Sequence, residues 1–292
     1  MVKKIKLLIT GSDGQLGRVF FKLSKHFPQY DFVFYSKKKL NVSNFNQLYK
    51  IVERNSPNLI INCAAFTDVD KAEISRSSAK LINTTSVENL ANICLEKNIK
   101  LMHFSTDYIF DGKKTELYSE NDIPNPIGYY GKSKLLGEKK ILDSKLKNSI
   151  IIRTSWLYSP FSKNFVNNVC SKINKKIDFE VYDDQLGSPT NAFDLAKSML
   201  LIIPRLTFDG TEIFHYSGIG YCSRYELAVK INSLLNGKSK ITPTKSFEKN
   251  SIRPVFSGLS CKKFIKFFDL YLKPWEISLE EYFQNNLHIN EV

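Results

Sequence analysis

Long apolar segments are missing from this sequence. Beyond the first strand, the longest apolar run is Met199–Ile203, far short of the roughly 20 residues that a helix needs to cross a membrane. The amino-terminal stretch MVKKIKLLIT is basic and then apolar, but a glycine loop follows it directly, which favours a buried strand over a signal peptide. We therefore expect a cytoplasmic protein with no membrane partner.

Cysteine and histidine are scarce and scattered. The 292 residues contain five cysteines and four histidines, and no Cys-x-x-Cys pair. Structural zinc sites and disulfide frameworks both need ligating or pairing residues at characteristic spacings. We expect neither, and no acidic cluster indicates another metal site.

Acidic residues are too few to balance the basic ones. There are 42 Lys and Arg against 29 Asp and Glu, which gives a net charge of +13. Such an excess suits nucleic acid, anionic lipid or an anionic small substrate, or simply reflects lysines spread over solvated faces. The longest basic run is Lys37–Lys39, without an arginine-rich block interleaved with aromatics, so we expect no nucleic-acid partner.

Short apolar runs do recur, separated by amphipathic segments. The runs at 4–10, 31–36, 58–64, 100–106 and 149–155 predict strands, and the segments near 15–27, 44–55, 78–97 and 129–147 predict helices. Alternation of this kind is typical of βαβ units and a parallel sheet covered on both faces. We predict an α/β fold with a Rossmann-type doubly wound parallel sheet.

After about residue 157 the alternation loosens, and proline, asparagine and aromatic residues become more frequent. We predict a Rossmann domain at residues 1–157 and a smaller C-terminal α/β substrate-binding lobe at residues 158–292. Part of 184–215 is expected to return to the Rossmann domain.

The first predicted strand runs into GSDGQLG, which places Gly11, Gly14 and Gly17 between a strand and a helix. The first glycine permits the tight turn, the second a close approach to a pyrophosphate, and the third close helix packing. The helix amino terminus then offers N–H groups to phosphate. A plain glycine turn is the alternative, but this context favours a dinucleotide site.

The end of the second strand indicates which dinucleotide binds. Selection of NADH usually uses an acidic residue there, about 20 residues after the loop, to bind the ribose hydroxyls. Here the chain reads Tyr35-Ser36 followed by Lys37–Lys39, with no carboxylate. Lysines at that position would attract a 2′-phosphate, so we expect NADPH to serve at least as well as NADH. The alternative is that these lysines are only solvated.

A tyrosine four residues before a lysine occurs twice, as Tyr35/Lys39 and Tyr130/Lys134. Only the second pair falls in a predicted helix, where residues i and i+4 share a face. The fourth strand ends in Ser105-Thr106-Asp107, and ligands bind beyond the carboxyl ends of parallel strands. We expect Thr106, Tyr130 and Lys134 to form a catalytic set, in which a lysine ammonium lowers the tyrosine pKa and Thr106 contacts the substrate oxygen.

Seven segments together resemble a known family, and the resemblance covers nearly the whole chain: 11–17, 62–73, 105–112, 130–139, 153–159, 184–190 and 253–259. The sequence resembles the dTDP-4-dehydrorhamnose reductase family of the extended short-chain dehydrogenases/reductases. That resemblance implies NAD(P)H-dependent reduction of a 4-keto sugar nucleotide to dTDP-L-rhamnose, a precursor of cell-surface polysaccharide such as lipopolysaccharide.

Carried over residue by residue, the resemblance implies three groups of functional residues. Tyr130 is the proton donor, Lys134 its partner and Thr106 the tuning hydroxyl. The cofactor side comprises Gly11, Gly14, Gln15, Leu16, Gly17, Asn41, Val42, Ala64, Ala65, Thr67 and Ser105, together with Tyr130 and Lys134. The substrate side comprises Thr106, Asp107, Tyr130, Trp156, Asn164, Gln185 and Arg253.

Simpler structural interpretations stay open for some of these residues. Asp107 could cap the turn after its strand, Trp156 could be a core aromatic, and Arg253 could form a surface ion pair. The sequence also departs from the family pattern at Leu40-Asn41, Cys63 and Gly128, and the first departure bears on the adenine ribose contacts.

Two rival functions stay open as well. One is reduction of another nucleotide-linked 4-keto-6-deoxysugar. The other is a non-catalytic role like that of the methionine adenosyltransferase regulatory subunit, a relative of these reductases. The resemblance further implies a homodimer. Family members sometimes carry a metal ion between subunits, which we do not expect here.

Overall fold

A computed structural model describes residues 4–246 and 252–286. Its centre is a six-stranded sheet, in which all strands are parallel and the order is β10-β5-β4-β3-β1-β2. The strands are β1 (Ile5–Thr10), β2 (Tyr30–Tyr35), β3 (Leu59–Asn62), β4 (Lys100–Thr106), β5 (Ser149–Thr154) and β10 (Thr211–His215). The prediction of an α/β fold with a doubly wound parallel sheet is confirmed.

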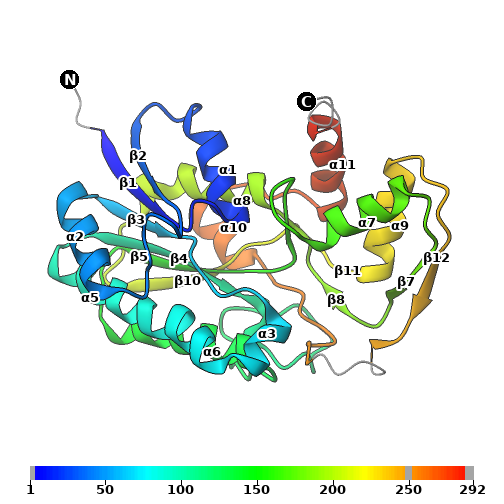
Figure 1. The fold of residues 1–292 in the computed structure, drawn as a ribbon, viewed down its shortest axis with the longest axis horizontal. Helices are drawn as coiled ribbons and strands as arrows, with labels where there is room; N and C mark the ends of the chain where they lie inside the picture. Colours follow the sequence, from blue (N-terminus) through cyan, green and yellow to red (C-terminus); the bar gives the residue numbers. More distant parts are fainter. Residues whose placement is uncertain (1–3, 247–251, 287–292) are drawn as a thin grey trace.

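Helices cover both faces of this sheet (Figure 1). On one face lie α1 (Gln15–Ser24), α8 (Ala192–Ile202) and α10 (Lys262–Phe268), which share a core with the strands. On the other lie α2 (Phe45–Asn55), α5 (Ser86–Glu96) and α6 (Tyr129–Asp143). Because both faces are covered, the strands are apolar almost throughout, and Leu59, Ile60 and Ile61 are all buried.

The predicted helix at 78–97 is confirmed, but it contains an irregular turn that the sequence pattern did not predict. It consists of α4 (Arg76–Lys80), a π-helical turn at Leu81–Thr85, and α5. In this wider turn the side chain of Asn83 points inward. Its amide accepts from the Phe66 N–H and donates to the Phe66 carbonyl oxygen and to the Ser133 hydroxyl. These hydrogen bonds join residues that are far apart in sequence, so the periodicity of side chains along the helix could not predict the π-helical turn.

A second group of elements lies to one side of the large sheet (Figure 1). It contains α7 (Phe165–Asn174), α9 (Arg224–Leu234) and α11 (Trp275–Asn286). Three short strand pairs accompany the helices: β6 (Leu157–Tyr158) with β9 (Thr190–Asn191), β7 (Phe179–Tyr182) with β12 (Ile241–Thr244), and β8 (Leu186–Gly187) with β11 (Cys222–Ser223). These elements share their own apolar core.

Strand β10 joins the large sheet by pairing with β5; helix α8, which precedes it, also packs on this sheet, whereas β11, which follows it, belongs to the second group. The helix α10 likewise packs on the large sheet. The proposed domain division at residue 157 stays a prediction, and residues 1–3, 247–251 and 287–292 of its two ranges lie outside the described part.

The chain reverses its direction of travel across the sheet between β1 and β3. From β1 it moves outward to β2, and it then returns to β3 on the other side of β1. Ligands of open α/β sheets bind at the carboxyl ends of the strands beside such a switch point. Within the described ranges, no helix combines the length and apolar character needed to cross a membrane.

Candidate active site

The glycine loop lies at the switch point, closely packed against the end of β3. Gly11 has φ +61°, a backbone conformation that favours glycine, and a Cβ there would meet the Ala64 backbone at 2.7 Å. A Cβ at Gly17 would meet the Gly11 carbonyl oxygen at 2.4 Å. These two glycines therefore let α1, its preceding loop and the β3 end approach one another, as the sequence pattern predicts.

The residues around this loop fit a dinucleotide. Helix α1 begins after Gly14 without a side-chain cap, so its first-turn N–H groups are open to an anion. At the carboxyl ends of β4 and β5, the buried hydroxyls of Ser105 and Thr154 and Oδ2 of Asp107 have no hydrogen-bond partner in the described structure. Buried polar atoms are normally paired, so this edge is suited to a polar ligand.

The end of β2 carries the predicted 2′-phosphate site. Lys37, Lys38 and Lys39 are exposed, and among the described residues they form no ion pair. The Lys37 backbone N–H donates to Asp13 Oδ1 at 3.2 Å, which brings this turn beside the glycine loop. Asn41 instead closes a local turn, since its side chain accepts from Ser43 and its N–H donates to Gln47.

Thr106 and Tyr130 come together at the carboxyl end of β4. Thr106 ends the strand, and its hydroxyl hydrogen-bonds Tyr130, which lies in the first turn of α6. A Cβ at Gly131 would meet the Tyr108 carbonyl oxygen at 2.0 Å, so glycine at this position permits the helix to approach the strand end. The sequence reasoning did not use Gly131, although a glycine directly after the two tyrosines can be read from the sequence.

The pKa of Tyr130 is raised rather than lowered, because its half-buried phenol is withdrawn from water and Asp107 and Tyr108 lie near it. The Thr106 hydrogen bond acts in the opposite direction. The expectation that Lys134 lowers this pKa is not met, since Lys134 is not among the groups that shift it. The lysine amine donates to the Phe104 carbonyl oxygen at 2.5 Å and lies 3.3 Å from His103 Nε2.

Lys134 is itself unusual, because its side chain is buried with only 2% of its surface exposed. Burial lowers the pKa of its amine to about 8, while the nearby Glu138 carboxylate opposes that change. The carboxylate is held by Arg153 at 2.7 Å in a buried ion pair. Helix α6 thus presents Tyr130, Lys134 and Glu138 along one face at intervals of four.

A cavity of about 780 Å³ opens among the second group of elements. Its walls carry the predicted residues Gln185 and Arg253, and also Arg224, which the sequence reasoning missed. Arg253 donates to Asp70 Oδ2 at 3.0 Å, so it forms the ion pair that was the simpler alternative while also lining the cavity. Lys172 and Lys245 line the same cavity, which suits an anionic ligand.

Trp156 lies between Arg224 and Gly187 at the boundary between the two groups of elements. Its φ is +42°, which is a genuine outlier for a bulky residue. The Arg224 guanidinium lies 3.4 Å from the ring centroid, and a Cβ at Gly187 would meet the indole at 2.4 Å. Only the fold brings these three residues together, which is why Arg224 escaped the sequence reasoning.

Asp107 is buried beside this cluster. Burial raises the pKa of its carboxyl to about 6, while hydrogen bonds from Ser257 and Thr106 and the charge of Arg224 oppose the change. The Tyr108 backbone N–H donates to Thr106, so Thr106 rather than Asp107 caps the turn after β4. The capping interpretation of Asp107 is therefore not supported.

The structure places Asn164 next to the glycine loop. Its amide donates to Gln15 Oε1 at 2.8 Å, and its side-chain oxygen caps α7 by accepting from Asn167. Gln15 in turn donates to the Leu157 carbonyl oxygen. Asn164 is absent from the walls of the substrate-side cavity, so its predicted contact with substrate stays a prediction.

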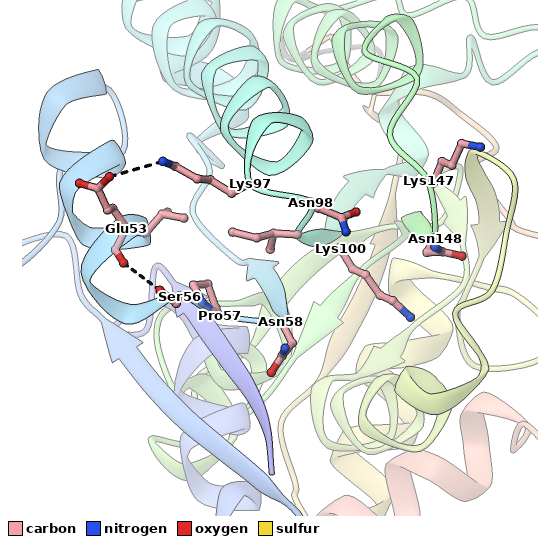
Figure 2. Close-up of a pocket in the computed structure, with 11 residues that line it drawn as sticks. Glu53, Ser56, Pro57, Asn58, Lys97, Asn98, Lys100, Lys147 and Asn148 are labelled. Atoms are coloured by element: carbon pink, nitrogen blue, oxygen red, sulfur yellow. Dashed lines mark hydrogen bonds and ion pairs between the residues drawn. The ribbon is translucent and has the colours of Figure 1, made fainter. Parts of the chain in front are cut away.

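A separate cavity of about 580 Å³ lies at the opposite, amino ends of β3, β4 and β5 (Figure 2). Its three lysines diverge and already have partners. Lys97 bonds Tyr49, Glu53 and Glu96, Lys100 bonds the Leu206 carbonyl oxygen, and Lys147 pairs with Asp209. It therefore lacks the free convergent cations of a phosphate site.

Metal and disulfide chemistry find no support in the described part of the chain. Residues 4–246 and 252–286 contain no group of three or more His, Cys, Asp or Glu side chains placed to hold a metal ion. All five cysteines lie in these ranges, and none forms a disulfide.

The parallel sheet and the glycine loop at its switch point form a dinucleotide-binding fold, and the similar proteins indicate an NAD(P)H-dependent oxidoreductase. Comparison with known proteins gives the family. The model of the RmlD substrate binding domain family matches residues 5–288, and the chain belongs to that family.

Three relatives illustrate the similarity. A dTDP-4-dehydrorhamnose reductase from Aggregatibacter actinomycetemcomitans is 34% identical over 286 residues, covering 94% of this chain and 97% of the relative. A dTDP-4-keto-6-deoxy-D-glucose reductase from Streptomyces niveus is 31% identical, covering 86% of this chain and 87% of the relative. The crystal structure of dTDP-4-dehydrorhamnose reductase from Bacillus anthracis, in complex with NADP, has a TM-score of 0.89 and 34% identity, covering 97% of this chain and 100% of that one.

Proposed function

We propose that this protein is a dTDP-4-dehydrorhamnose reductase, which uses NADPH to reduce the 4-keto group of dTDP-4-dehydro-L-rhamnose. The observation that carries the proposal is the placement of Thr106, Tyr130 and Lys134 at the carboxyl end of β4, beside the glycine loop. Family membership supports the substrate class. The exposed Lys37–Lys39 at the end of β2 support NADPH over NADH.

The cofactor would be held by the glycine loop, the first turn of α1 and the unpartnered Ser105 hydroxyl, and it supplies hydride when bound. Tyr130 donates its proton to the oxygen that becomes the new hydroxyl. The high pKa of Tyr130 keeps that proton in place until negative charge develops on the substrate oxygen. Thr106 orients the phenol of Tyr130. Lys134, one helical turn after Tyr130, is the third residue of the proposed catalytic set.

Positive charge in the 780 Å³ cavity supports the binding of a sugar nucleotide. Arg224 and Lys172 lie on its walls without an ion pair among the described residues, and a diphosphate needs such cations. Arg253 and Lys245 also line it, but they pair with Asp70 and Asp183. We assign Arg224 and Arg253 to the diphosphate and Trp156 to the sugar. We assign Asp107 to a sugar hydroxyl; the support is that its buried Oδ2 has no hydrogen-bond partner in the described structure.

The direct test is oxidation of NADPH by the purified protein in the presence of dTDP-4-dehydro-L-rhamnose, with identification of the product by mass spectrometry and NMR. Formation of dTDP-L-rhamnose is expected. Turnover of only a different 4-keto-6-deoxysugar nucleotide would show that this other sugar nucleotide is the substrate. The similarity to a dTDP-4-keto-6-deoxy-D-glucose reductase from Streptomyces niveus is a reason to test that alternative. Tight cofactor binding without turnover of any keto sugar would favour the non-catalytic regulatory role.

We also propose a homodimer in the cytoplasm. Sedimentation equilibrium at several protein concentrations checks the dimer, and fractionation of the source cells checks the location.

A further inference from the structure

Behind Lys134, a chain of buried polar side chains runs across three strands. Lys134 Nζ lies 3.3 Å from His103 Nε2 on β4, His103 Nδ1 lies 3.0 Å from Asn62 Nδ2 on β3, and Asn62 Oδ1 lies 2.6 Å from the Thr10 hydroxyl on β1. All four residues are buried. The proposed reaction uses only Lys134, so the other three polar groups need another explanation.

The hydrogen-bond directions in this chain are determined from its far end. The Thr10 oxygen accepts from the Ala64 N–H, so the Thr10 proton is free to donate to Asn62 Oδ1. The Asn62 amide group then donates to His103 Nδ1, which must be the unprotonated ring nitrogen. A neutral His103 therefore carries its proton on Nε2, the nitrogen that faces Lys134.

A protonated Nε2 has a definite effect on the lysine. An ammonium group has three donors and no acceptor, whereas a neutral amine has a lone pair that accepts a hydrogen bond. The contact between Nε2–H and Nζ is a hydrogen bond only with the neutral amine. That amine still donates to the Phe104 carbonyl oxygen.

We propose that Asn62 and His103 are positioning residues for Lys134, which hold its amine at the end of β4 and favour its neutral form in the cofactor-free protein. The inference rests on the proposed function for its catalytic meaning, although its geometry does not depend on the substrate. The protein would then possess a lysine whose charge changes within the working pH range, under the control of residues that touch neither ligand.

The charges that face Lys134 agree with this arrangement. Glu138 favours the ammonium, but Arg153 already holds its carboxylate. Tyr130 is neutral because its pKa is raised, and the pKa of His103 is lowered well below its ordinary value by burial and by Lys134 itself. Burial of the lysine amine, which lowers its pKa to about 8, acts in the same direction as the Nε2–H contact.

The test begins with the wild-type, cofactor-free protein and needs no substrate. Nitrogen-15 NMR of labelled histidine reports which ring nitrogen carries the proton, with the His103 signals assigned by their loss in His103→Gln. We expect a neutral ring protonated at Nε2 from about pH 6 to about pH 9. A ring protonated at Nδ1, or an imidazolium in that range, would overturn the proposal.

Asn62→Asp is the diagnostic variant, because it replaces the amide donor by an acceptor of nearly the same shape. The His103 proton should move to Nδ1, so that Nε2 accepts from the lysine ammonium. We expect the pKa of Lys134, followed by carbon-13 NMR of its Cε, to rise by about one unit, a tenfold change. The charge of the new carboxylate contributes to that rise, so the move of the His103 proton to Nδ1 is the result that supports the proposal, and a proton that stays on Nε2 contradicts it. Asn191→Asp is the matched control, since Asn191 is similarly buried but its amide donates to the Ser278 carbonyl oxygen on α11 instead.

Turnover provides a second readout. The alkaline limb of kcat/KM reports groups of the free enzyme, and in Asn62→Asp it should move to higher pH with the lysine pKa, while Asn191→Asp leaves it in place. Equal, pH-independent losses of kcat/KM in both variants would mean that these buried polar side chains have only a structural role, and would contradict the proposal. If the wild type reduces no keto sugar, the proposed function fails, and the two NMR measurements still decide the inference.

Discussion

The guanidinium of Arg224 lies flat over the indole of Trp156, 3.4 Å from the ring centroid. The same guanidinium hydrogen-bonds Tyr108 and lies over the ring of Phe165 at 4.8 Å. Trp156 adopts a left-handed backbone at φ +42°, which costs of order 1–3 kcal/mol and persists only where surrounding contacts enforce it. Arg224 and Gly187 therefore hold Trp156 in place between the two groups of elements.

Gly187→Ala tests this arrangement without removing a functional group. The new Cβ would meet the Trp156 ring at 2.4 Å, so the indole must move off Gly187 and out of its stack with Arg224. We expect KM for the sugar nucleotide to rise about 10-fold or more, since misplacement of a positioning group is costly. The dissociation constant for NADPH, measured by fluorescence titration, should be unchanged. An unaltered KM would show that the position of Trp156 does not matter for substrate binding.

Tyr130→Phe should abolish most turnover. Loss of a general acid removes roughly 10²- to 10⁴-fold in kcat, while the aromatic ring and the cofactor contacts of other residues stay. The measurement is single-turnover oxidation of bound NADPH. Tyr129→Phe is the matched control, because Tyr129 lies one residue earlier and stacks with Arg76 at the surface. Near-normal turnover by Tyr130→Phe would refute its assignment as the proton donor.

The lysines after β2 should determine cofactor preference. In the double variant Lys37→Glu with Lys38→Glu, repulsion of the 2′-phosphate should raise KM for NADPH about tenfold and leave KM for NADH nearly unchanged. Lys262→Glu, an exposed lysine at the start of α10, controls for the change in overall charge. A wild-type enzyme with a strong preference for NADH would contradict the prediction before any variant is made.

The ion pair between Glu138 and Arg153 should be important for stability. Both side chains are buried, with 1% and 4% of their surfaces exposed, so Glu138→Gln leaves a buried arginine without its counter-charge. We expect a loss of about 3–5 kcal/mol in the free energy of unfolding, measured with urea. Asp209→Asn breaks the exposed pair with Lys147 and should cost less than about 1 kcal/mol. Equal losses of unfolding free energy in the two variants would mean that the buried ion pair stabilises the protein no more than the exposed one.

Asp107 should make the protein less stable as the pH rises. Its pKa is raised to about 6 in the folded protein, so the folded state binds its proton more tightly than the unfolded state does. The stability contributed by the protonated carboxyl is complete below the unfolded pKa of about 4 and is lost as the pH rises through about 6. Asp107→Asn should therefore exceed the wild type in stability above about pH 6, by about 2–3 kcal/mol.

Urea unfolding at a series of pH values checks this sign. Asp111→Asn provides the opposite case, because the N–H of Lys113 and other hydrogen bonds lower the pKa of Asp111, whose contribution is lost only as the pH falls. An advantage of Asp107→Asn that does not grow between about pH 4 and about pH 6 would contradict the raised pKa. The same variant should bind the sugar nucleotide more weakly, so stability and affinity change in opposite directions.

The sequence by itself determined the elements and the chemistry that depends on local spacing. Apolar runs and helical periodicity predicted five strands of the sheet and the start of α6 at Tyr129, because residues in one helix or strand meet their neighbours through fixed geometry. The glycine loop and the Tyr130/Lys134 spacing were visible for the same reason.

The tertiary structure alone decided which distant residues meet. Arg224 reaches Trp156, His103 reaches Lys134, and the π-helical turn at Leu81–Thr85 forms through hydrogen bonds to Phe66 and Ser133. It also set the Lys134 amine against His103 and the Phe104 carbonyl oxygen, contacts that the spacing alone did not predict. Burial sets the charges in this site, and the burial of a side chain depends on packing across the whole fold rather than on its neighbours in sequence.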